Sequence, residues 1–365
     1  MSRPVAGATV PASQRAVAQI DRGAITRNCE RLTRELGDRT AFGAVVKADG
    51  YGHGAAEAAQ AALDGGATWL FVATSEEVVG LPGGATVVVM GAIAGSELPG
   101  VIAAGADVVA WSADFVEQLP PGARVHVKLD TGMGRLGTRD PEEATRVAEA
   151  AVARGCVVAG LMTHFATADE RGDAFFGEQL KRFRAWAEPL RARFPGAVLH
   201  AANSAATLRD GASHFDLVRC GIAIYGMDPF GVDPAEHGLE PALSLRSWVA
   251  AVKPLAPGQS VGYGRRFVAA EPTRIVTVPI GYGDGWRRAL SDNGEVVIGG
   301  RRHPIVGNVS MDNVAVDVGT AGVAVGDAVT LLGDGILAEA VAARIGTINY
   351  EVTCALTPRV TRTYV

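Results

Sequence analysis

The stretch AVVKADGYGHGA, residues 44–55, contains the end of an apolar run, a glycine-rich turn and the start of an alanine-rich segment. The run FGAVV, residues 42–46, has the unbroken hydrophobicity typical of a strand covered on both faces of a parallel sheet. It leads into Lys47, and lysine is seldom fully buried unless it is paired. Lys47 is therefore either a strand-end lysine that reaches solvent or an amine held in a pocket.

The same strand–turn–helix pattern recurs from about residue 15 to about residue 235. Strands are predicted at residues 41–46, 68–73, 86–91, 107–111, 124–129, 157–162, 197–202 and 216–226. Clear helical segments lie at 52–66, 140–155 and 175–194, the last with an apolar stripe at three- and four-residue steps. About eight such units favour a parallel (β/α)8 TIM-type barrel, and a doubly wound open sheet is the alternative.

The chain changes character after about residue 240. Strand-like runs such as residues 273–283 and 303–318 follow one another between Gly, Pro and Asp turns, and helical runs almost vanish. Such a region indicates a separate, mostly-β domain. The 365 residues are therefore predicted to form a flexible tail over 1–14, a barrel over 15–238 and a β-strand domain over 239–365.

Charge and composition exclude several classes of protein. The formal net charge of −5 comes from dispersed charges of both signs, which disfavours nucleic acid as a partner. The longest apolar runs are too short to span a bilayer, and the N-terminus lacks the apolar segment of a signal peptide. The four cysteines lie far apart without a CxxC pair, so neither a metal site nor a disulfide framework is predicted. We expect a cytoplasmic protein that binds neither nucleic acid nor membrane.

Polar side chains gather where the predicted strands end. In a parallel barrel, catalytic residues come from the C-terminal ends of several strands. Each residue alone has a structural explanation as a cap or a surface ion pair, but the set converges on one face of one barrel. Its members are Lys47, Lys128, Asp130, Arg135, Thr163, His164, His200, Asn203, Ser204, Arg219, Gly221 and Ile222.

Two of these places point to an anionic ligand. The glycines around Tyr51 let backbone amides approach a ligand before a helix start, and Asn203 and Ser204 open another helix. Alternatively, Asn203 and Ser204 only cap that helix. A phosphate site together with Lys47 suggests pyridoxal phosphate, whose aldehyde forms a Schiff base with a lysine amine.

At this point the sequence resembles the alanine racemase family, from about residue 15 to the C-terminus. The resemblance rests on VVKADGYGHG (45–54), KLDTGMGRLG (128–137), GLMTHFA (160–166), HAANSAA (200–206), FDLVRCGIAIYG (215–226), SVGYGRRF (260–267), VPIGYGDGW (278–286) and GNVSMDN (307–313). It implies interconversion of L-alanine and D-alanine with pyridoxal 5'-phosphate. Lys47 holds the cofactor and acts as one base. Tyr263 acts as the other and comes from the partner subunit of a head-to-tail homodimer.

The resemblance also assigns the remaining site residues. Tyr51, Ser204, Gly221, Ile222 and Tyr350 match phosphate contacts, next to Asn203. Arg219 matches the residue that faces the pyridine nitrogen, His164 packs on the ring and bonds toward the tyrosine, and Arg135 lies near the phenolic oxygen and the substrate. Lys128 matches a lysine that is often carbamylated, which fixes Arg135. Tyr282, Met311 and Asp312 match the substrate gate on the partner side.

These assignments make chemical sense for racemisation. The reaction needs acid–base groups on opposite faces of one carbon, and a tyrosine with its ordinary pKa of about 10 needs positive neighbours to act as a base. His164 and Arg219 are the candidates. Arginine only donates, so we expect the pyridine nitrogen to stay unprotonated, which limits reprotonation at the wrong carbon and suppresses transamination.

Some features leave alternatives open. Where many members of the family have arginine and glutamine in the gate motif, this chain has Asn308 and Asn313, so the preference for substrate size is not fixed. A serine racemase of the same fold, a decarboxylase of the related barrel-plus-β family and a non-enzymatic barrel that carries the cofactor are the rivals. The resemblance also does not decide the biological role, which is supply of D-alanine for peptidoglycan, catabolism, or self-protection in an antibiotic producer.

Overall fold

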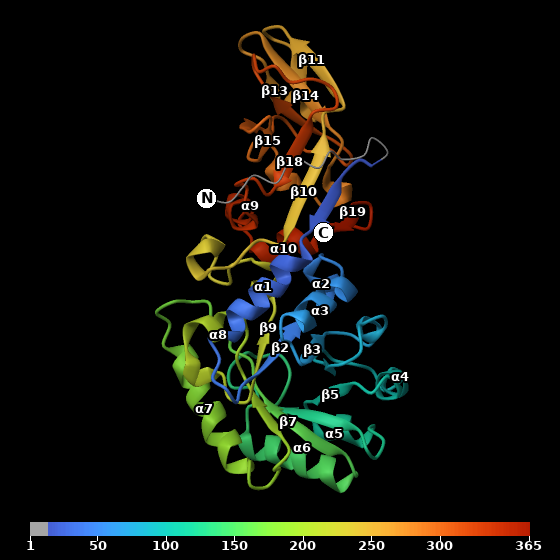
Figure 1. The fold of residues 1–365 in the computed structure, drawn as a ribbon, viewed down its shortest axis with the longest axis vertical. Coiled ribbons are helices and arrows are strands. Elements are labelled where there is room, and N and C mark those ends of the chain that lie inside the picture. Colours follow the sequence, from blue (N-terminus) through green and yellow to red (C-terminus); the bar gives the residue numbers. More distant parts are fainter. Residues whose placement is uncertain (1–13) are drawn as a thin grey trace. The chain divides into compact units, whose positions relative to one another are not determined.

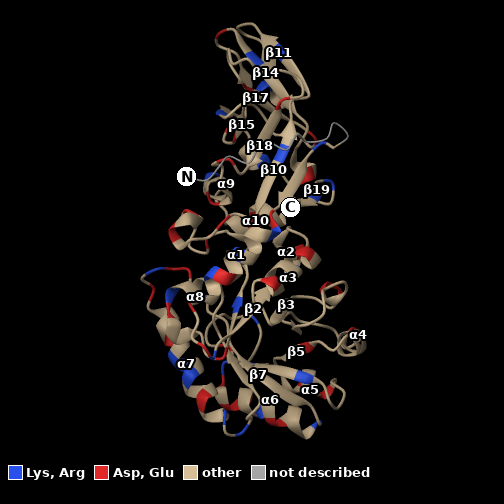
Figure 2. Ribbon diagram, viewed as in Figure 1, with Lys and Arg blue, Asp and Glu red and all other residues tan. Residues whose placement is uncertain are grey.

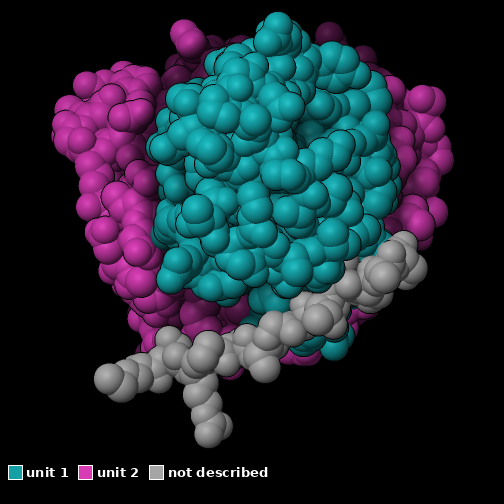
Figure 3. Space-filling view, turned by 90° about the horizontal axis from the view of Figure 1, so that it is seen from above, with its two compact units in different colours: residues 1–22, 241–365 teal, residues 23–240 magenta. Residues whose placement is uncertain are grey.

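The computed structural model describes residues 14–365, which fall into two compact units (Figures 1 and 3). One unit comprises residues 23–240, and the other combines residues 241–365 with the N-terminal segment up to Arg22. The tail predicted over residues 1–14 lies, except for Gln14, outside the described residues.

The unit of residues 23–240 is built on an eight-stranded parallel sheet in the order β8-β7-β6-β5-β4-β3-β2-β9 (Figure 1). Its strands are β2 (Ala41–Val45), β3 (Trp69–Val72), β4 (Thr86–Val89), β5 (Asp107–Ala110), β6 (Arg124–Lys128), β7 (Val157–Met162), β8 (Val198–His200) and β9 (Leu217–Cys220). The backbone N–H of Asp216 donates to Leu199 O at 3.0 Å, and that of Arg219 donates to Ala202 O at 2.9 Å. These bonds join the two outermost strands. The predicted barrel is therefore confirmed over the open sheet.

Helices follow most of these strands, as the sequence predicts. They are α2 (Lys47–Tyr51), α3 (Ala55–Asp64), α4 (Leu98–Ala103), α5 (Ala113–Glu117), α6 (Pro141–Ala153), α7 (Phe175–Leu190) and α8 (Ser204–Arg209), whereas α1 (Arg22–Thr33) precedes β2. Asp140 caps α6 by accepting from the Glu142 N–H at 2.9 Å. The predicted apolar stripe of α7 is buried at Phe176, Leu180 and Phe183, so it is the face that packs on the barrel.

The strand predicted over residues 216–226 is too long. β9 ends at Cys220, and residues Ile222–Tyr225 form a short 3-10 helix. Gly221 between them has φ −112° and ψ −94°, a conformation that takes the chain out of the sheet. The apolar run GIAIYG is equally compatible with a buried helical turn, which periodicity alone does not distinguish from a strand.

The second unit contains most of its strands in one mixed sheet, ordered β16-β15-β18-β10-β1-β19. A three-stranded sheet, β11-β14-β17, and a two-stranded hairpin, β12-β13, complete it. The strands are β1 (Val17–Ile20), β10 (Leu243–Trp248), β11 (Ala251–Leu255), β12 (Ser260–Val261), β13 (Phe267–Val268), β14 (Thr273–Val278), β15 (Glu295–Ile298), β16 (Arg301–Pro304), β17 (Val314–Asp317), β18 (Ala328–Leu332) and β19 (Thr361–Tyr364). Two helices, α9 (Ala338–Ile345) and α10 (Asn349–Cys354), accompany the sheets.

The sequence predicted a barrel that begins at residue 15, and this prediction is wrong. β1 pairs antiparallel with β10 and parallel with β19, so residues 17–20 belong to the second unit. A short apolar strand indicates burial but not which sheet it joins, because its partners lie far away in the sequence. Val17, Ala18 and Ile20 are buried there.

Lys, Arg, Asp and Glu are spread over both units without a single-sign stripe (Figure 2). Across residues 14–365, no helix combines the length and apolarity needed to cross a membrane. In the same range, no group of three or more His, Cys, Asp or Glu side chains is arranged to hold a metal ion.

Candidate active site

Lys47 lies at the C-terminal end of β2, where it is half-buried and begins a turn of unusual backbone geometry. Ala48, Asp49 and Tyr51 have φ values of 52°, 52° and 55°, in the left-handed region that L-residues avoid at a cost of about 1–2 kcal/mol each. Glu77 holds this turn: one carboxylate oxygen accepts from the Ala48 N–H at 2.6 Å and the other from the Ala73 N–H at 2.7 Å. The loops after β2 and β3 are thus tied together by one side chain.

The predicted phosphate contacts of the barrel unit come together. Ser204 Oγ accepts from the backbone N–H groups of Gly221 and Ala223, at 2.9 and 3.3 Å. A Cβ on Gly221 would lie 2.4 Å from Tyr51 Oη, so the tyrosine hydroxyl rests directly on this glycine. Ile222 follows at once in the chain and is buried. Only a residue without a side chain leaves this cradle open.

Asn203 caps a helix, which was the alternative to a phosphate contact. Its side-chain oxygen accepts from the Ala206 N–H at 3.0 Å and caps α8. A contact of Asn203 with the cofactor stays a prediction.

Arg219 lies on β9 and is 2% exposed. Its Nη2 donates to the carbonyls of Thr163 and Ala201, at 2.9 and 3.0 Å, and contacts His164 Nδ1 at 3.1 Å. Arginine has no acceptor, so His164 Nδ1 must accept. Burial and the cations of Arg219, Lys128, Arg135 and Lys47 hold the pKa of His164 well below its ordinary value. His164 is therefore a neutral ring with its proton on Nε2.

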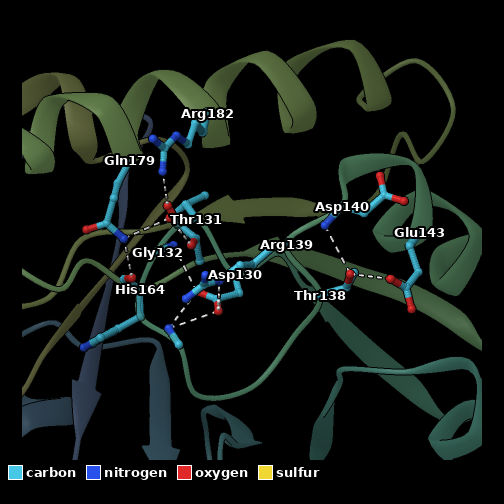
Figure 4. A network of polar contacts seen from close by, with 12 residues as sticks. Asp130, Thr131, Gly132, Thr138, Arg139, Asp140, Glu143, His164, Gln179 and Arg182 are labelled. Carbon is cyan, nitrogen blue, oxygen red and sulfur yellow. Dashed lines mark hydrogen bonds and ion pairs between the residues drawn. The ribbon is translucent and has the colours of Figure 1, made fainter.

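Lys128, at the end of β6, lies within an excess of positive charge. Burial, followed by the cations of Arg135 and Arg219, lowers the pKa of Lys128 to about 8, against the opposing charge of Asp130. Arg135 itself is exposed. Asp130 is occupied with shaping its own loop, because its carboxylate accepts from the N–H groups of Gly132 and Gly134 (Figure 4).

Sequence reasoning missed the polar support behind His164 (Figure 4). Gln179 Nε2 donates to His164 O at 3.3 Å and to Thr131 Oγ1 at 3.1 Å, and Thr131 Oγ1 contacts Thr163 Oγ1 at 2.8 Å. Gln179 is fully buried on the apolar face of α7. A glutamine on that face was the available signal, since buried amides need hydrogen-bond partners.

Tyr263 belongs to the second unit, in the turn between β12 and β13, with 76% of its surface exposed. Gly262 and Gly264 flank it with φ values of 72° and 71°, which the turn requires. Asn308 Nδ2 donates to the backbone carbonyl of Tyr263 at 2.8 Å. The Tyr263 side chain is therefore exposed while its backbone is held by Asn308.

The predicted gate residues lie close together in the second unit. The backbone N–H of Tyr282 donates to Ser310 O at 3.0 Å, next to Met311 and Asp312 in the chain. Arg359 Nη2 donates to Asp312 Oδ1 at 2.6 Å and its Nε pairs with Asp284 Oδ1 at 3.1 Å. Met311 and Tyr282 are 51% and 43% exposed. Tyr350 lies on α10 of the same unit.

Comparisons with known proteins show the family of this chain. Residues 20–229 match the family model described as alanine racemase, N-terminal domain, and residues 242–364 match that for the C-terminal domain. The chain belongs to the alanine racemase family. It is 40% identical to alanine racemase of Frankia casuarinae over 386 aligned positions, which cover 100% of both chains.

Solved structures of the alanine racemase family superpose on this chain. Alanine racemase from E. faecalis has a TM-score of 0.92 and 37% identity, and covers 98% of this chain and 100% of its own. Alanine racemase from Bartonella henselae, with covalently bound pyridoxal phosphate, has a TM-score of 0.87 and 29% identity and covers 98% and 100%.

The barrel residues suit the cofactor of this family. A dianionic phosphate needs donors and positive charge. Ser204, the Gly221 backbone and Tyr51 lie together, and the cations of Lys47, Arg135 and Arg219 all act on Lys128 in the same barrel. The aldehyde needs a lysine amine, which Lys47 supplies. The residues present therefore fit pyridoxal phosphate.

Proposed function

We propose that this chain binds pyridoxal 5'-phosphate through Lys47 and interconverts L-alanine and D-alanine. The single observation that carries the proposal is the full-length identity of 40% to a named alanine racemase. The positions of Lys47, His164 and Arg219, each at or just after the end of a strand of one barrel, support it. The relatives reported above are alanine racemases, and nothing in them favours serine as the substrate.

The bound cofactor supplies an electron sink that stabilises negative charge at the substrate Cα. The chain supplies proton transfer on both sides of that carbon. The Lys47 amine removes or returns the proton on one face, and the Tyr263 hydroxyl does so on the other. This division gives racemisation rather than simple proton exchange, because the proton leaves one face and returns on the opposite one.

His164 supports the tyrosine through its hydrogen-bond direction. Since Arg219 donates to His164 Nδ1, the remaining ring N–H is at Nε2 and is able to donate to a phenolate oxygen. A donor and nearby cations stabilise the deprotonated tyrosine that the reaction needs. The bond from Arg219 thus determines that His164 presents an N–H donor, at Nε2, to the tyrosine base.

Arg219 also governs the cofactor's pyridine nitrogen. Burial lowers the pKa of Arg219 to about 10, which leaves the guanidinium charged at neutral pH. A charged guanidinium donates a hydrogen bond but gives no acceptor for an N–H on the ring. Arg219 would therefore keep the pyridine nitrogen of the bound cofactor unprotonated, which would favour return of the proton to the substrate carbon over transfer of the amino group.

Lys128 is proposed to carry a carbamate. With a pKa of about 8, part of the Lys128 amine is neutral near physiological pH. The neutral nitrogen would form a bond to the carbon of carbon dioxide and lose one N–H proton to solvent. The new negative charge on Lys128 would lie beside Arg135 and Arg219. Two ion pairs would then take the place of the repulsion among the cations of Lys128, Arg135 and Arg219. It would hold Arg135 toward the cofactor and the substrate.

The active form is proposed to be a cytoplasmic homodimer with shared active sites. Tyr263, Tyr282 and Met311 are large side chains left exposed on the second unit, which supports contact with another subunit. In a head-to-tail dimer, each barrel would receive Tyr263 and the gate residues, including Asp312, from its partner. Tyr350 would complete the phosphate site. The product, D-alanine, would serve as a peptidoglycan precursor.

Circular dichroism of L-alanine over time tests the proposed function directly. The purified protein with pyridoxal phosphate should convert L-alanine to a racemic mixture, and serine should react far more slowly. The Lys47→Ala variant should lose both the visible absorbance of the cofactor and turnover. A wild-type protein that binds the cofactor yet leaves the L-alanine signal unchanged would refute the proposal.

A further inference from the structure

A line of four buried polar groups crosses the barrel behind Arg219. Arg219 Nη1 contacts His200 Nδ1 at 3.1 Å, His200 Nε2 contacts His126 Nδ1 at 2.8 Å, and His126 Nε2 contacts Asp107 Oδ2 at 3.1 Å. These four side chains are at most 2% exposed. They come from β9, β8, β6 and β5, of which β9 is the neighbour of β2, the strand that Lys47 follows.

The barrel is shaped to admit this line. A Cβ on Gly160 of β7 would lie 2.2 Å from His126 Nδ1, closer than any side-chain atom can approach. The His126 and His200 rings meet edge to face, with centroids 4.9 Å apart. Gly160, on the strand between β6 and β8, therefore leaves room for the two imidazoles in hydrogen-bond contact.

Donor and acceptor rules fix the direction of every bond in the line. Arg219 has no acceptor, so His200 Nδ1 accepts and its proton lies on Nε2. His200 Nε2–H then donates to His126 Nδ1, which places the His126 proton on Nε2 and directs it to the Asp107 carboxylate. Each ring is locked in one tautomer by its neighbours.

The charges around the two rings agree with neutral imidazoles. Burial is the main reason that the pKa of His126 is lowered, and it is opposed by Asp107 and reinforced by Arg124 and Arg219. Burial, Arg219, His126 and Lys128 hold the pKa of His200 well below its ordinary value. Two neutral rings thus connect a buried cation to a buried anion. The other oxygen of the Asp107 carboxylate, Oδ1, pairs with Arg124 Nε at 2.9 Å.

We propose that Asp107, His126 and His200 are positioning residues that orient Arg219 and set the tautomer of His164. The inference rests on the proposed function, in which Arg219 faces the cofactor and His164 faces the base. The carboxylate keeps the His126 proton on Nε2. Without the Asp107 carboxylate, His126 can carry its proton on Nδ1 and donate to His200 Nε2. The His200 proton then lies on Nδ1 and faces Arg219, and two donors cannot form a hydrogen bond. Arg219 would turn away and release His164.

The tautomers are measured directly with 15N-histidine-labelled protein by NMR, in the holoenzyme and after removal of the cofactor. The expected result is an unprotonated Nδ1 and a protonated Nε2 in both His126 and His200, in both forms. Protonation at His200 Nδ1 in the wild type overturns the proposal, whether or not any variant folds.

Variants separate positioning from a merely structural role. Asp107→Asn should populate the other tautomer of His126 and His200, shift the absorbance of the bound cofactor and lower kcat several-fold with a smaller change in KM. The matched control is Arg124→Gln, which alters the second partner of Asp107 without entering the line, and it should keep wild-type tautomers and spectrum. An Asp107→Asn protein with wild-type tautomers, spectrum and kcat also overturns the proposal.

The two proposals fail in different ways. If the wild-type protein shows the predicted tautomers but does not racemise alanine, the proposed function is refuted and the hydrogen-bond line stands. Active enzyme with a protonated His200 Nδ1 would refute the line alone.

Discussion

The side-chain amide of Asn308 donates to the backbone carbonyl of Tyr263 at 2.8 Å, across the 45 residues that separate them in the chain. The bond ties the turn that presents Tyr263 to the loop before the gate residues. It also gives a structural role to Asn308 in the stretch GNVSMDN, residues 307–313.

Replacing Asn308 should loosen Tyr263 without disturbing the cofactor. In the Asn308→Ala variant, kcat for alanine racemisation should fall by roughly tenfold, because small misplacements of a proton-transfer group carry penalties of this order or larger. The absorbance of the bound cofactor should stay unchanged. Asn313→Ala is the control, since Asn313 meets Ser310 through its backbone and should keep near-wild-type turnover. Equal rates for all three proteins would show that the Asn308 bond does not position the base.

The left-handed turn after Lys47 should be measurable as stored strain. Ala48 has φ 52°, and glycine adopts that conformation freely, so Ala48→Gly should raise the free energy of unfolding by about 0.5–1 kcal/mol. The same change at exposed Ala56, within α3, should lower it by about 1 kcal/mol. Urea unfolding of both variants gives the comparison. A destabilised Ala48→Gly protein would contradict the strain.

Glu77 should matter because it holds that strained turn. Glu77→Ala removes the acceptor for the Ala48 and Ala73 N–H groups and should weaken pyridoxal phosphate binding and lower stability by about 1–3 kcal/mol. The neighbouring Glu76→Ala is the control, with little change expected. Cofactor affinity is read from absorbance titration. Wild-type affinity in Glu77→Ala would mean that the turn holds its shape unaided.

Acid should destabilise the barrel through its buried histidines. The pKa values of His126 and His200 are lowered by burial, so both rings stay neutral in the folded protein while they protonate in the unfolded chain. Their contribution to stability is complete above about pH 6.5. As the pH falls below 6.5 toward the folded pKa values, it is lost at about 1.4 kcal/mol per pH unit for each histidine. Urea unfolding from pH 7.5 to 5.5 checks this slope, and a His126→Asn variant should show a shallower one. A flat profile below pH 6.5 would contradict the neutral assignment.

The Lys128 carbamate should be visible as a bound carbon. Protein equilibrated with 13C-bicarbonate should show a carbamate resonance that is absent from Lys128→Ala. The variant should handle substrate poorly, and small carboxylates should partly restore turnover by replacing the missing negative charge beside Arg135. A wild-type spectrum identical to that of the variant would exclude the modification.

Much of the barrel and its site could be predicted because parallel βα units leave a strong local pattern. Lys47, Lys128, His164 and Arg219 all follow or end apolar runs, and runs of that kind become the buried strands. The position of β1 could not be predicted, since its partners β10 and β19 are more than 200 residues away. The hydrogen-bond line from Arg219 to Asp107 could not be predicted from the sequence either. His126 and Asp107 look like ordinary strand residues until the curvature of the barrel brings β5, β6 and β8 to a common centre.

The central claim is that the Lys47 amine and the Tyr263 hydroxyl of different subunits serve one active site. The most direct test co-expresses Lys47→Ala and Tyr263→Ala chains with different affinity tags and purifies dimers through both tags. Each variant alone should be inactive, whereas the mixed dimer contains one site with both groups intact and should show about half of the wild-type kcat per dimer. An inactive mixed dimer that still binds one equivalent of cofactor would contradict the claim.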